Sequence, residues 1–377
     1  NVSRSYKPAA IGVTSTCLSE TIGEDVLRYL RQYEKERQEG RRNHGDAAPM
    51  LFYVSTASYR GTHVDGFHEA IWAAVSTLAG RDQPSGTASL STRVNLISGF
   101  VSPEDLRELH GILGSFGIAY TLLPDYSETL DGPSWETYQK LPAGGTKIAD
   151  IQVMGEAAGT LYLGYPPGKN GGAWLAEHRA VPLIHRDLPI GIANTDLFFQ
   201  ALEELSGRET PEVWTKQRGR LIDAYIDGHK YCSGKRAIIY GEEDLVAALA
   251  SFLDEIGVIP VIAATGAERP GFRMRIQAAL RNTREETEVM DDADFIAILE
   301  RARDAGADFV MGHSKGLYLS RELGIPLVRC GFPIHDRIGG QRILHLGYRG
   351  TMNLFDLIGN TLLQAKQDRV SKGYTYL

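Results

Sequence analysis

The chain alternates between short apolar runs and longer amphipathic stretches, and this alternation predicts repeated strand–helix units. Gly, Pro, Ser and Asp bound the apolar runs, which have the length of strands. The expected strands are Ala10–Thr16, Met50–Ser55, Val94–Ser98, Tyr120–Pro124, Thr160–Gly164, Ala237–Tyr240, Pro260–Ala263, Glu288–Met290, Asp308–Met311 and Pro326–Arg329. We therefore predict an α/β fold built on mainly parallel sheets.

The amphipathic stretches carry their apolar residues at intervals of three and four, as helices do when one side is buried. In Asp244–Ile256 this spacing builds a single stripe from Leu245, Leu249, Phe252, Leu253 and Ile256. Gly257 follows directly, and a glycine after the last turn commonly ends a helix. We therefore expect this helix to lie with its stripe against a sheet and to end before Gly257.

Two breaks divide the chain into three blocks, each with its own strands. The stretch Arg81–Thr92 is polar and contains Gly, Pro and Ser, as connections between domains often do. The second break is a long polar helix, Pro211–Tyr231, which leads into the strand Ala237–Tyr240. A chain of 377 residues is too long for one compact core. We predict three α/β domains, at residues 1–92, 93–212 and 213–377, the last with a C-terminal helix.

Composition and charge exclude several classes of protein. Hydrophobic residues make up 43% of the chain and charged residues 23%, as in globular proteins that bury a core. The net charge of -7 argues against a nucleic-acid-binding protein, which needs a concentrated basic surface. Three cysteines are too few for a disulfide framework, which favours a reducing compartment. No segment approaches the roughly 20 apolar residues of a membrane span, so we expect a soluble cytoplasmic protein.

Cys17 occupies a position that is suited to chemistry. It follows the predicted strand Ala10–Thr16 directly, and an acidic amphipathic stretch comes after it. Ligands of open α/β sheets bind just outside the carboxyl ends of strands, where a thiolate can act as a metal ligand or a nucleophile. A lone cysteine is also commonly a small buried apolar residue, and both interpretations are open at this point.

A second loop with many hydroxyl groups, Ser55–Phe67, leaves the next predicted strand and leads into a helix. Its backbone N–H groups and hydroxyls are suited to hydrogen-bonding cluster sulfides or an anion. The alternative is a plain connection in which Thr62 or His63 caps the helix. Because this is the next strand–helix loop after that of Cys17, we expect the two loops to lie near each other.

Two later loops are candidates for a turn and an interface. Gly312–Gly316 resembles a short anion-binding turn but lacks the spacing of a phosphate-binding P-loop, so a tight strand–helix turn is favoured. Gly331–Gly340 combines glycine, aromatic and charged residues, as ordered interface loops do, and Asp336 and Arg337 are candidate partners in an ion pair. Cys232 and Cys330 are assigned to packing.

Taken together, these motifs resemble the β subunits of the nitrogenase component 1 family. Thr16–Asp25 is similar to the family segment Thr-Cys-x-x-Glu-x-Ile-Gly-Asp-Asp, and Thr56–His63 is similar to the loop Thr-Pro-Ser-Phe-Val-Gly-Ser-His. In the second loop Ala57 replaces the proline and Thr62 replaces the last serine, so a hydroxyl is kept. Further segments extend the likeness over nearly the whole chain: Pro124–Asp125, Leu130–Pro133, Gly144–Thr146, Arg218–Asp223 and Gly331–Arg337.

The resemblance implies three Rossmann-like domains and the role of a β-type subunit in a nitrogenase-like reductase. In the family, the cysteine at the position of Cys17 ligates the P-cluster, an eight-iron seven-sulfur centre shared between the α and β subunits. The hydroxyl at the position of Thr62 can supply an oxygen ligand when that cluster is oxidised. The implied partner is an α-type subunit that holds the active-site metal cofactor, in an α2β2 heterotetramer. A separate ATP-dependent iron protein would deliver electrons.

On this interpretation the chain relays electrons and holds no catalytic residue of its own. The substrate would be dinitrogen or another small molecule, such as a methylthio-alkane. The family places two more P-cluster cysteines before the Thr-Cys segment, and this chain begins too late to contain them. We therefore expect the first, cluster-ligating domain to be incomplete, truncated at its N terminus.

Two other functions are open. The tail residues Gly339–Gly340 and Gly347–Thr351 favour the β-like subunit of the scaffold on which the nitrogenase cofactor is assembled. The Cys17 segment and Leu130–Pro133 favour the catalytic complex instead. A freestanding sugar- or nucleotide-binding α/β protein would explain the fold, but it would not explain this set of motifs.

Overall fold

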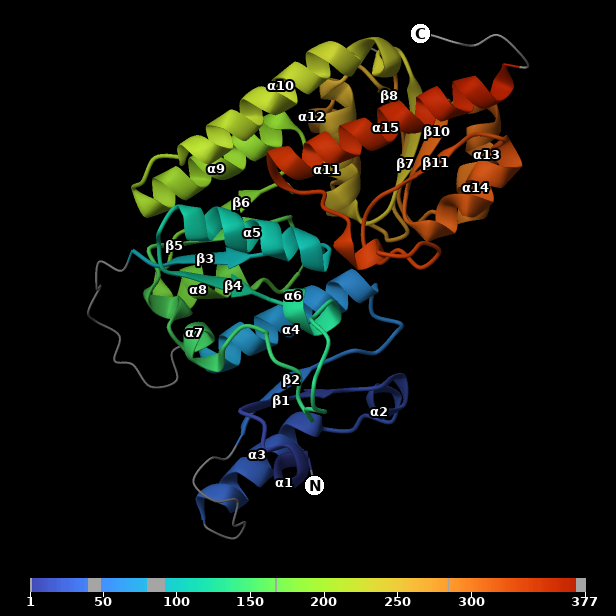
Figure 1. Cartoon of the computed structure of the whole chain (residues 1–377). Helices are drawn as coiled ribbons and strands as arrows, with labels where there is room; N and C mark the ends of the chain where they lie inside the picture. Colours follow the sequence, from blue (N-terminus) through green and yellow to red (C-terminus); the bar gives the residue numbers. More distant parts are fainter. Residues whose placement is uncertain (1, 40–48, 80–91, 167, 284, 371–377) are drawn as a thin grey trace. The chain divides into compact units, whose positions relative to one another are not determined.

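In the part of the chain that the structure describes, three parallel sheets form the framework (Figure 1). The structure is a computed structural model that describes residues 2–39, 49–79, 92–166, 168–283 and 285–370. The chain divides into two units, one of residues 1–98, 119–162 and 166–184, the other of residues 99–118, 163–165 and 185–377. The predicted α/β class with parallel strands is confirmed.

The first sheet is small and sparsely covered. Strand β1 (Ala10–Thr14) pairs in parallel with β2 (Met50–Val54), so that each residue lies opposite the one forty positions later. The helices α2 (Cys17–Thr21) and α3 (Val26–Gln38) connect the two strands, and α1 (Val2–Tyr6) precedes them. Val54 is the one residue of these two strands that is fully buried. Parallel sheets are usually covered on both faces, so the described chain leaves this sheet unusually open.

The second sheet has the order β4-β3-β5-β6, and its central strands are fully buried. Its strands are β3 (Val94–Ile97), β4 (Tyr120–Leu123), β5 (Gly159–Leu163) and β6 (Leu183–Arg186). The helices α4 (His63–Leu78), α7 (Ile148–Gln152) and α8 (Gly171–Arg179) share an apolar core with β3 and β5, including Val75, Ile97, Ile151, Tyr162 and Leu175. Strand β6 was not predicted from the sequence.

The third sheet has the order β11-β10-β7-β8-β9. Its strands are β7 (Arg236–Tyr240), β8 (Ile259–Ala264), β9 (Glu288–Met290), β10 (Phe309–Gly312) and β11 (Leu327–Arg329), and the helices of this region are α11 (Glu243–Glu255), α12 (Phe272–Ala279), α13 (Phe295–Ala305) and α14 (Leu317–Leu323). The apolar stripe predicted for α11 is buried. Gly257 lies just after this helix with a φ of 72°, a left-handed conformation that favours glycine.

Longer helices complete the second unit. They are α5 (Pro103–Ser115), α9 (Ile192–Ser206), α10 (Glu212–Cys232) and α15 (Gly347–Arg369). Further short elements among the described residues are α6 (Ser127–Leu130), η1 (Met154–Glu156), η2 (Ser314–Gly316) and η3 (Gly340–Arg342). Helices α10 and α15 run side by side (Figure 1). A Cβ atom at Gly228 would lie 2.5 Å from the ring of Phe355, so glycine permits this close approach. The predicted polar helix Pro211–Tyr231 is present, shifted by one residue.

The proposed boundary at residue 92 falls where little of the chain is described, because residues 81–91 of the stretch Arg81–Thr92 lie outside the described residues. The division into domains at 1–92, 93–212 and 213–377 therefore stays a prediction. Within the described part of the chain, no helix combines the length and the apolar character that crossing a membrane requires.

The packing of α11 leads to a test of the third sheet's core. Leu249 has no exposed surface, whereas Leu357 on α15 is 39% exposed. Replacing Leu249 with Ala should destabilise the folded chain by about 2–5 kcal/mol, because it removes buried methyl groups and leaves a cavity. Leu357→Ala, the matched control, should change stability by about 0.5 kcal/mol or less. Urea unfolding of the two variants measures the difference, and equal midpoints would contradict this account of the core.

Candidate functional site

The loops that follow β1 and β2 lie against each other, as predicted. The parallel pairing continues past the strand ends, since the Ser15 backbone N–H donates to the Val54 carbonyl oxygen at 3.1 Å. The Thr56 backbone N–H then donates to Ser15 Oγ at 2.9 Å, and the Thr56 hydroxyl donates to the Ser15 carbonyl oxygen at 2.6 Å. The forty-residue offset of the strands therefore also sets the position of one loop against the other.

Cys17 begins a short helix and does not follow the strand directly, as the sequence had predicted it would. Strand β1 ends at Thr14, not at Thr16 as the sequence suggested, and Cys17 is the first residue of α2. The change arises because Thr16 is the N-cap: its backbone N–H donates to Ser19 Oγ at 2.8 Å, and its hydroxyl accepts from the Ser19 N–H at 3.2 Å. The capping turn holds the Cys17 side chain at the surface, where it is a free, partly exposed thiol.

Ser58, in the loop after β2, contacts the sulfur of Cys17 with two groups. Its hydroxyl oxygen lies 2.8 Å from Cys17 Sγ, and its backbone N–H donates to the same sulfur at 3.2 Å. Hydrogen bonds from the hydroxyl and then the N–H of Ser58 hold the pKa of the Cys17 thiol below its usual value. A thiolate is the form that binds metal ions, so these contacts favour ligation.

The carboxylate of Glu20, on α2, contacts residues of both loops and of β2. Its Oε1 atom accepts hydrogen bonds from Ser15 Oγ at 2.6 Å, from Ser55 Oγ at 2.7 Å and from the Tyr53 hydroxyl at 2.9 Å. The guanidinium of Arg60 lies 3.6 Å from the other carboxylate oxygen. Donation by Ser15, Ser55 and Tyr53 lowers the pKa of Glu20 to about 2, so the group is ionised at neutral pH.

Thr62 caps helix α4, as the plain-connection interpretation of its loop expected. Its backbone N–H and its hydroxyl both donate to Asp65 Oδ2, at 2.6 and 3.0 Å. Asp65 is the third residue of the helix, so the pair forms the helix-start arrangement known as a capping box. The hydroxyl of Thr62 is thus already engaged by a carboxylate in this structure. Its role as a cluster ligand stays a prediction.

Within the described ranges, no three His, Cys, Asp or Glu side chains come together as a group that could hold a metal ion. The chemistry of Cys17 nonetheless fits one ligand of an iron-sulfur cluster. Its thiol is partly exposed, has a lowered pKa and is hydrogen-bonded to the hydroxyl and to the backbone N–H of Ser58. Such donors to the ligand sulfur are a usual means by which proteins tune cluster potentials.

The other two cysteines are buried, as predicted. Burial raises the pKa of Cys232 to about 11 and raises the pKa of Cys330 still further. Both side chains therefore stay protonated at neutral pH and pack as small apolar groups.

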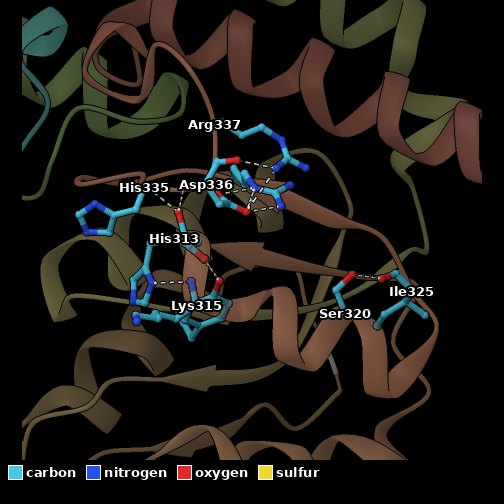
Figure 2. A network of polar contacts seen from close by, with 10 residues as sticks. His313, Lys315, Ser320, Ile325, His335, Asp336 and Arg337 are labelled. Carbon is cyan, nitrogen blue, oxygen red and sulfur yellow. Dashed lines mark hydrogen bonds and ion pairs between the residues drawn. The ribbon is translucent and has the colours of Figure 1, made fainter.

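The loops Gly312–Gly316 and Gly331–Gly340 form a structural network in the second unit (Figure 2). After β10 the chain makes the short turn η2, which confirms the tight turn that was predicted. Ser314 Oγ accepts hydrogen bonds from the backbone N–H groups of His335 and Asp336, at 2.8 and 3.3 Å. Figure 2 shows the loop with His335 and Asp336 hydrogen-bonded to the turn with His313 and Lys315.

Asp336 forms the predicted ion pair with Arg337, at 3.4 Å, but its closer partner is another arginine. Arg329 Nη2 lies 2.6 Å from Asp336 Oδ2, and Arg329 Nε donates to both carboxylate oxygens at 3.0 Å. These hydrogen bonds from Arg329 hold the pKa of Asp336 well below its usual range. The arrangement explains how a glycine-rich loop is kept in one conformation.

Sequence reasoning named the loop that contains Ser58 and the segment that contains Glu20, but it did not single out these two residues. A signal for Glu20 was present, because the glutamate belongs to the Thr-Cys-x-x-Glu segment itself. The signal for Ser58 was weaker: the nearness of the two loops was predicted, but only the pairing of Ala10 with Met50 shows which residue of the second loop meets Cys17.

Comparison with known proteins identifies relatives over nearly the whole chain. The family described as nitrogenase component 1 type oxidoreductase matches residues 1–363. The molybdenum-iron protein beta chain of Clostridium pasteurianum is 35% identical, over 96% of this chain and 77% of its own length. The vanadium-iron protein beta chain of Trichormus variabilis is 34% identical, over 95% of this chain and 78% of its own length. A solved structure titled nitrogenase Cp1 at pH 6.5 superposes with a TM-score of 0.91 at 34% identity, covering 99% of this chain and 79% of that one.

The different surroundings of the three cysteines predict a difference in reactivity. Cys17 is partly exposed with a lowered pKa, whereas Cys232 and Cys330 are buried with raised ones. Iodoacetamide should therefore modify Cys17 first in the metal-free native chain, because the thiolate is the nucleophile. Peptide mass spectrometry over time measures the order, and Cys17→Ser should abolish the fast phase. Modification of Cys232 or Cys330 ahead of Cys17 would refute the assignment.

The lowered pKa of Glu20 predicts a pH dependence. A carboxyl group whose pKa falls from 4.5 to about 2 on folding contributes stability above its unfolded pKa and loses it as pH falls toward its folded pKa. The difference in melting temperature between the native chain and Glu20→Gln should thus be constant near neutral pH and shrink below 4.5. Thermal unfolding at stepped pH measures it. A difference that grows on acidification would have the wrong sign.

Proposed function

The chain belongs to the nitrogenase component 1 type oxidoreductases, and from this premise we propose that it is the β-type subunit of a nitrogenase-like reductase. In this role it shares a P-cluster-type iron-sulfur cluster with an α-type subunit and relays electrons toward an active-site metal cofactor on that partner. The observation that carries the proposal is the Cys17 sulfur, which lies partly exposed at the surface with two hydrogen bonds from Ser58.

The residues around Cys17 suit a ligand for iron. Cys17 would bind the cluster as a thiolate, and Ser58 would orient the sulfur and stabilise its negative charge. The bound cluster would supply one-electron transfer. Thr62 would serve as a second contact only after its hydroxyl is released from Asp65, to which it now donates. We therefore expect Cys17 to be the constant ligand and Thr62 a conditional one.

The surface around Cys17 suits cover by another polypeptide. Leu18, within the short helix α2, and Ile22, directly after it, are 70% and 63% exposed, and Tyr59, next to Ser58, is 59% exposed. Apolar side chains gathered around a metal-ligating thiolate on a sparsely covered sheet are typical of a buried subunit contact. We propose that the α-type subunit covers this surface and contributes the facing ligands, in an α2β2 assembly served by an ATP-dependent iron protein.

The proposal concerns the cluster-holding role and is not tied to one substrate. The beta chains of a molybdenum-iron and a vanadium-iron protein are similar to this chain to nearly the same degree, at 35% and 34% identity. The substrate is therefore proposed at the level of a class, dinitrogen or another small molecule such as a methylthio-alkane. The reaction itself would take place on the partner subunit.

Removing the thiolate tests the ligand role. Cys17→Ala should lower the iron bound per αβ pair in the co-purified complex and abolish the cluster's electron paramagnetic signal, because no other group replaces the sulfur. Cys232→Ala, which removes a buried thiol from α10, is the matched control and should leave the iron count unchanged. An unchanged iron count in Cys17→Ala would remove Cys17 from the cluster.

A turnover assay separates the reductase from the assembly scaffold. The complex purified with its α-type partner and the cognate iron protein should reduce substrate in the presence of dithionite and ATP. Binding of a cofactor precursor without turnover would instead favour the scaffold. The predicted cytoplasmic location stays a prediction.

A further inference from the structure

Glu20 occupies a special place in the geometry around Cys17. Along the chain, Cys17 lies between Ser15 and Glu20, and Ser15 donates to the Glu20 carboxylate at 2.6 Å. That hydrogen bond therefore joins the two ends of the segment Ser15–Glu20, which contains Cys17. Any movement of the carboxylate would move both ends of the segment.

Residues before and after Ser58 in the chain also contact the Glu20 carboxylate. On one side Ser55 donates to Glu20 Oε1 at 2.7 Å, and on the other Arg60 lies 3.6 Å from Glu20 Oε2. Arg60 also donates to Ser55 Oγ at 3.3 Å, which closes the second segment. The segments Ser15–Glu20 and Ser55–Arg60, which contact each other at the Cys17 sulfur, are thus both held by the Glu20 carboxylate.

We propose that Glu20 is a positioning residue that fixes the hydrogen-bonding groups of Ser58 against the Cys17 sulfur and thereby sets the properties of the cluster bound there. This inference rests on the proposed function, because it assigns the cluster to Cys17. Glu20 itself touches neither the sulfur nor, in this proposal, the iron. It acts through the hydroxyls of Ser15 and Ser55 and through the guanidinium of Arg60.

The contributions of the four partners differ. Ser15, Ser55 and Tyr53 donate short hydrogen bonds to an ionised oxygen, the stronger kind of hydrogen bond. Arg60 is 61% exposed, and an exposed ion pair contributes little to stability. The hydroxyl contacts should therefore carry most of the positioning, with Arg60 as a minor restraint on the Ser58 side.

The test uses the complex with its α-type partner and compares Glu20→Gln with Glu24→Gln. Glu24 is exposed and lies four residues after Glu20, so its replacement removes one negative charge without breaking the hydrogen bonds of the Glu20 carboxylate. Glu20→Gln should keep the iron, because the amide oxygen still accepts hydrogen bonds, but should shift the cluster's midpoint potential to more positive values. Glu24→Gln should leave the potential close to that of the native complex. Equal potentials in the native complex and Glu20→Gln would overturn the proposal.

A second set of variants grades the effect. Glu20→Ala, which removes all four contacts, should lose iron as well as shift the potential. Arg60→Val keeps the three hydroxyl contacts and should shift the potential less than Glu20→Gln does. A larger shift in Arg60→Val would contradict the assignment of the positioning to the hydroxyl contacts.

A measurement without metal separates this inference from the proposed function. In the metal-free chain, Glu20→Gln should slow the alkylation of Cys17 by iodoacetamide several-fold relative to Glu24→Gln, because the weaker hydrogen bonds to a neutral amide hold Ser58 less firmly against the thiolate. If the native complex holds no iron at Cys17, the proposed function fails while this rate difference still tests the positioning. Equal rates in the two variants would overturn the positioning role, even if iron is present.

Discussion

The in-register pairing of β1 with β2 is the constraint on which the candidate site depends. Because each residue of β1 lies opposite the one forty positions later, the chain leaves the two strands with Thr14 opposite Val54, and the Ser15 N–H donates to the Val54 carbonyl oxygen. The pairing continues into the loops through the hydrogen bonds of Ser15 and Thr56. Cys17 and Ser58 meet only because of this alignment, and a slip of the register by one residue would separate them.

The sparse covering of this first sheet contrasts with the dense core of the third. Helix α11 is buried along nearly its whole length, whereas α2 and α3 have no fully buried residue among those described. A site in the dense region would be closed to a partner. The open sheet instead presents its thiol at the surface, which is the arrangement that a cluster shared between two chains requires. The proposed function thus depends on a region of the chain in which few side chains are buried.

Much of the fold could be predicted because apolar runs and helical periodicity are local signals. The ten expected strands are present within one or two residues at their ends. Strand β6 was missed because only Leu183 and Ile184 are apolar, followed by His185 and Arg186, and an edge strand needs no longer run. The helix start at Cys17 was missed because the capping by Ser19 depends on side-chain geometry.

The site was predictable only in part, for a related reason. Cys17 stood out by its residue type and its place after a strand, and Thr62 by its place in a recognisable loop. Two of the four partners of Glu20 lie 33 and 35 residues away in the sequence, at Tyr53 and Ser55, and no local pattern joins them to it. Likewise the closer partner of Asp336 is Arg329 on β11, not its neighbour Arg337. Such long-range polar contacts become visible only when the strands are paired.

Anomalous diffraction at the iron absorption edge, from crystals of the chain with its α-type partner, tests the central claim most directly. The account predicts an iron peak at bonding distance from the Cys17 sulfur, at the contact between the two subunits. Iron found only elsewhere in the complex, with the Cys17 sulfur hydrogen-bonded to Ser58 and bound to no metal, would contradict this account.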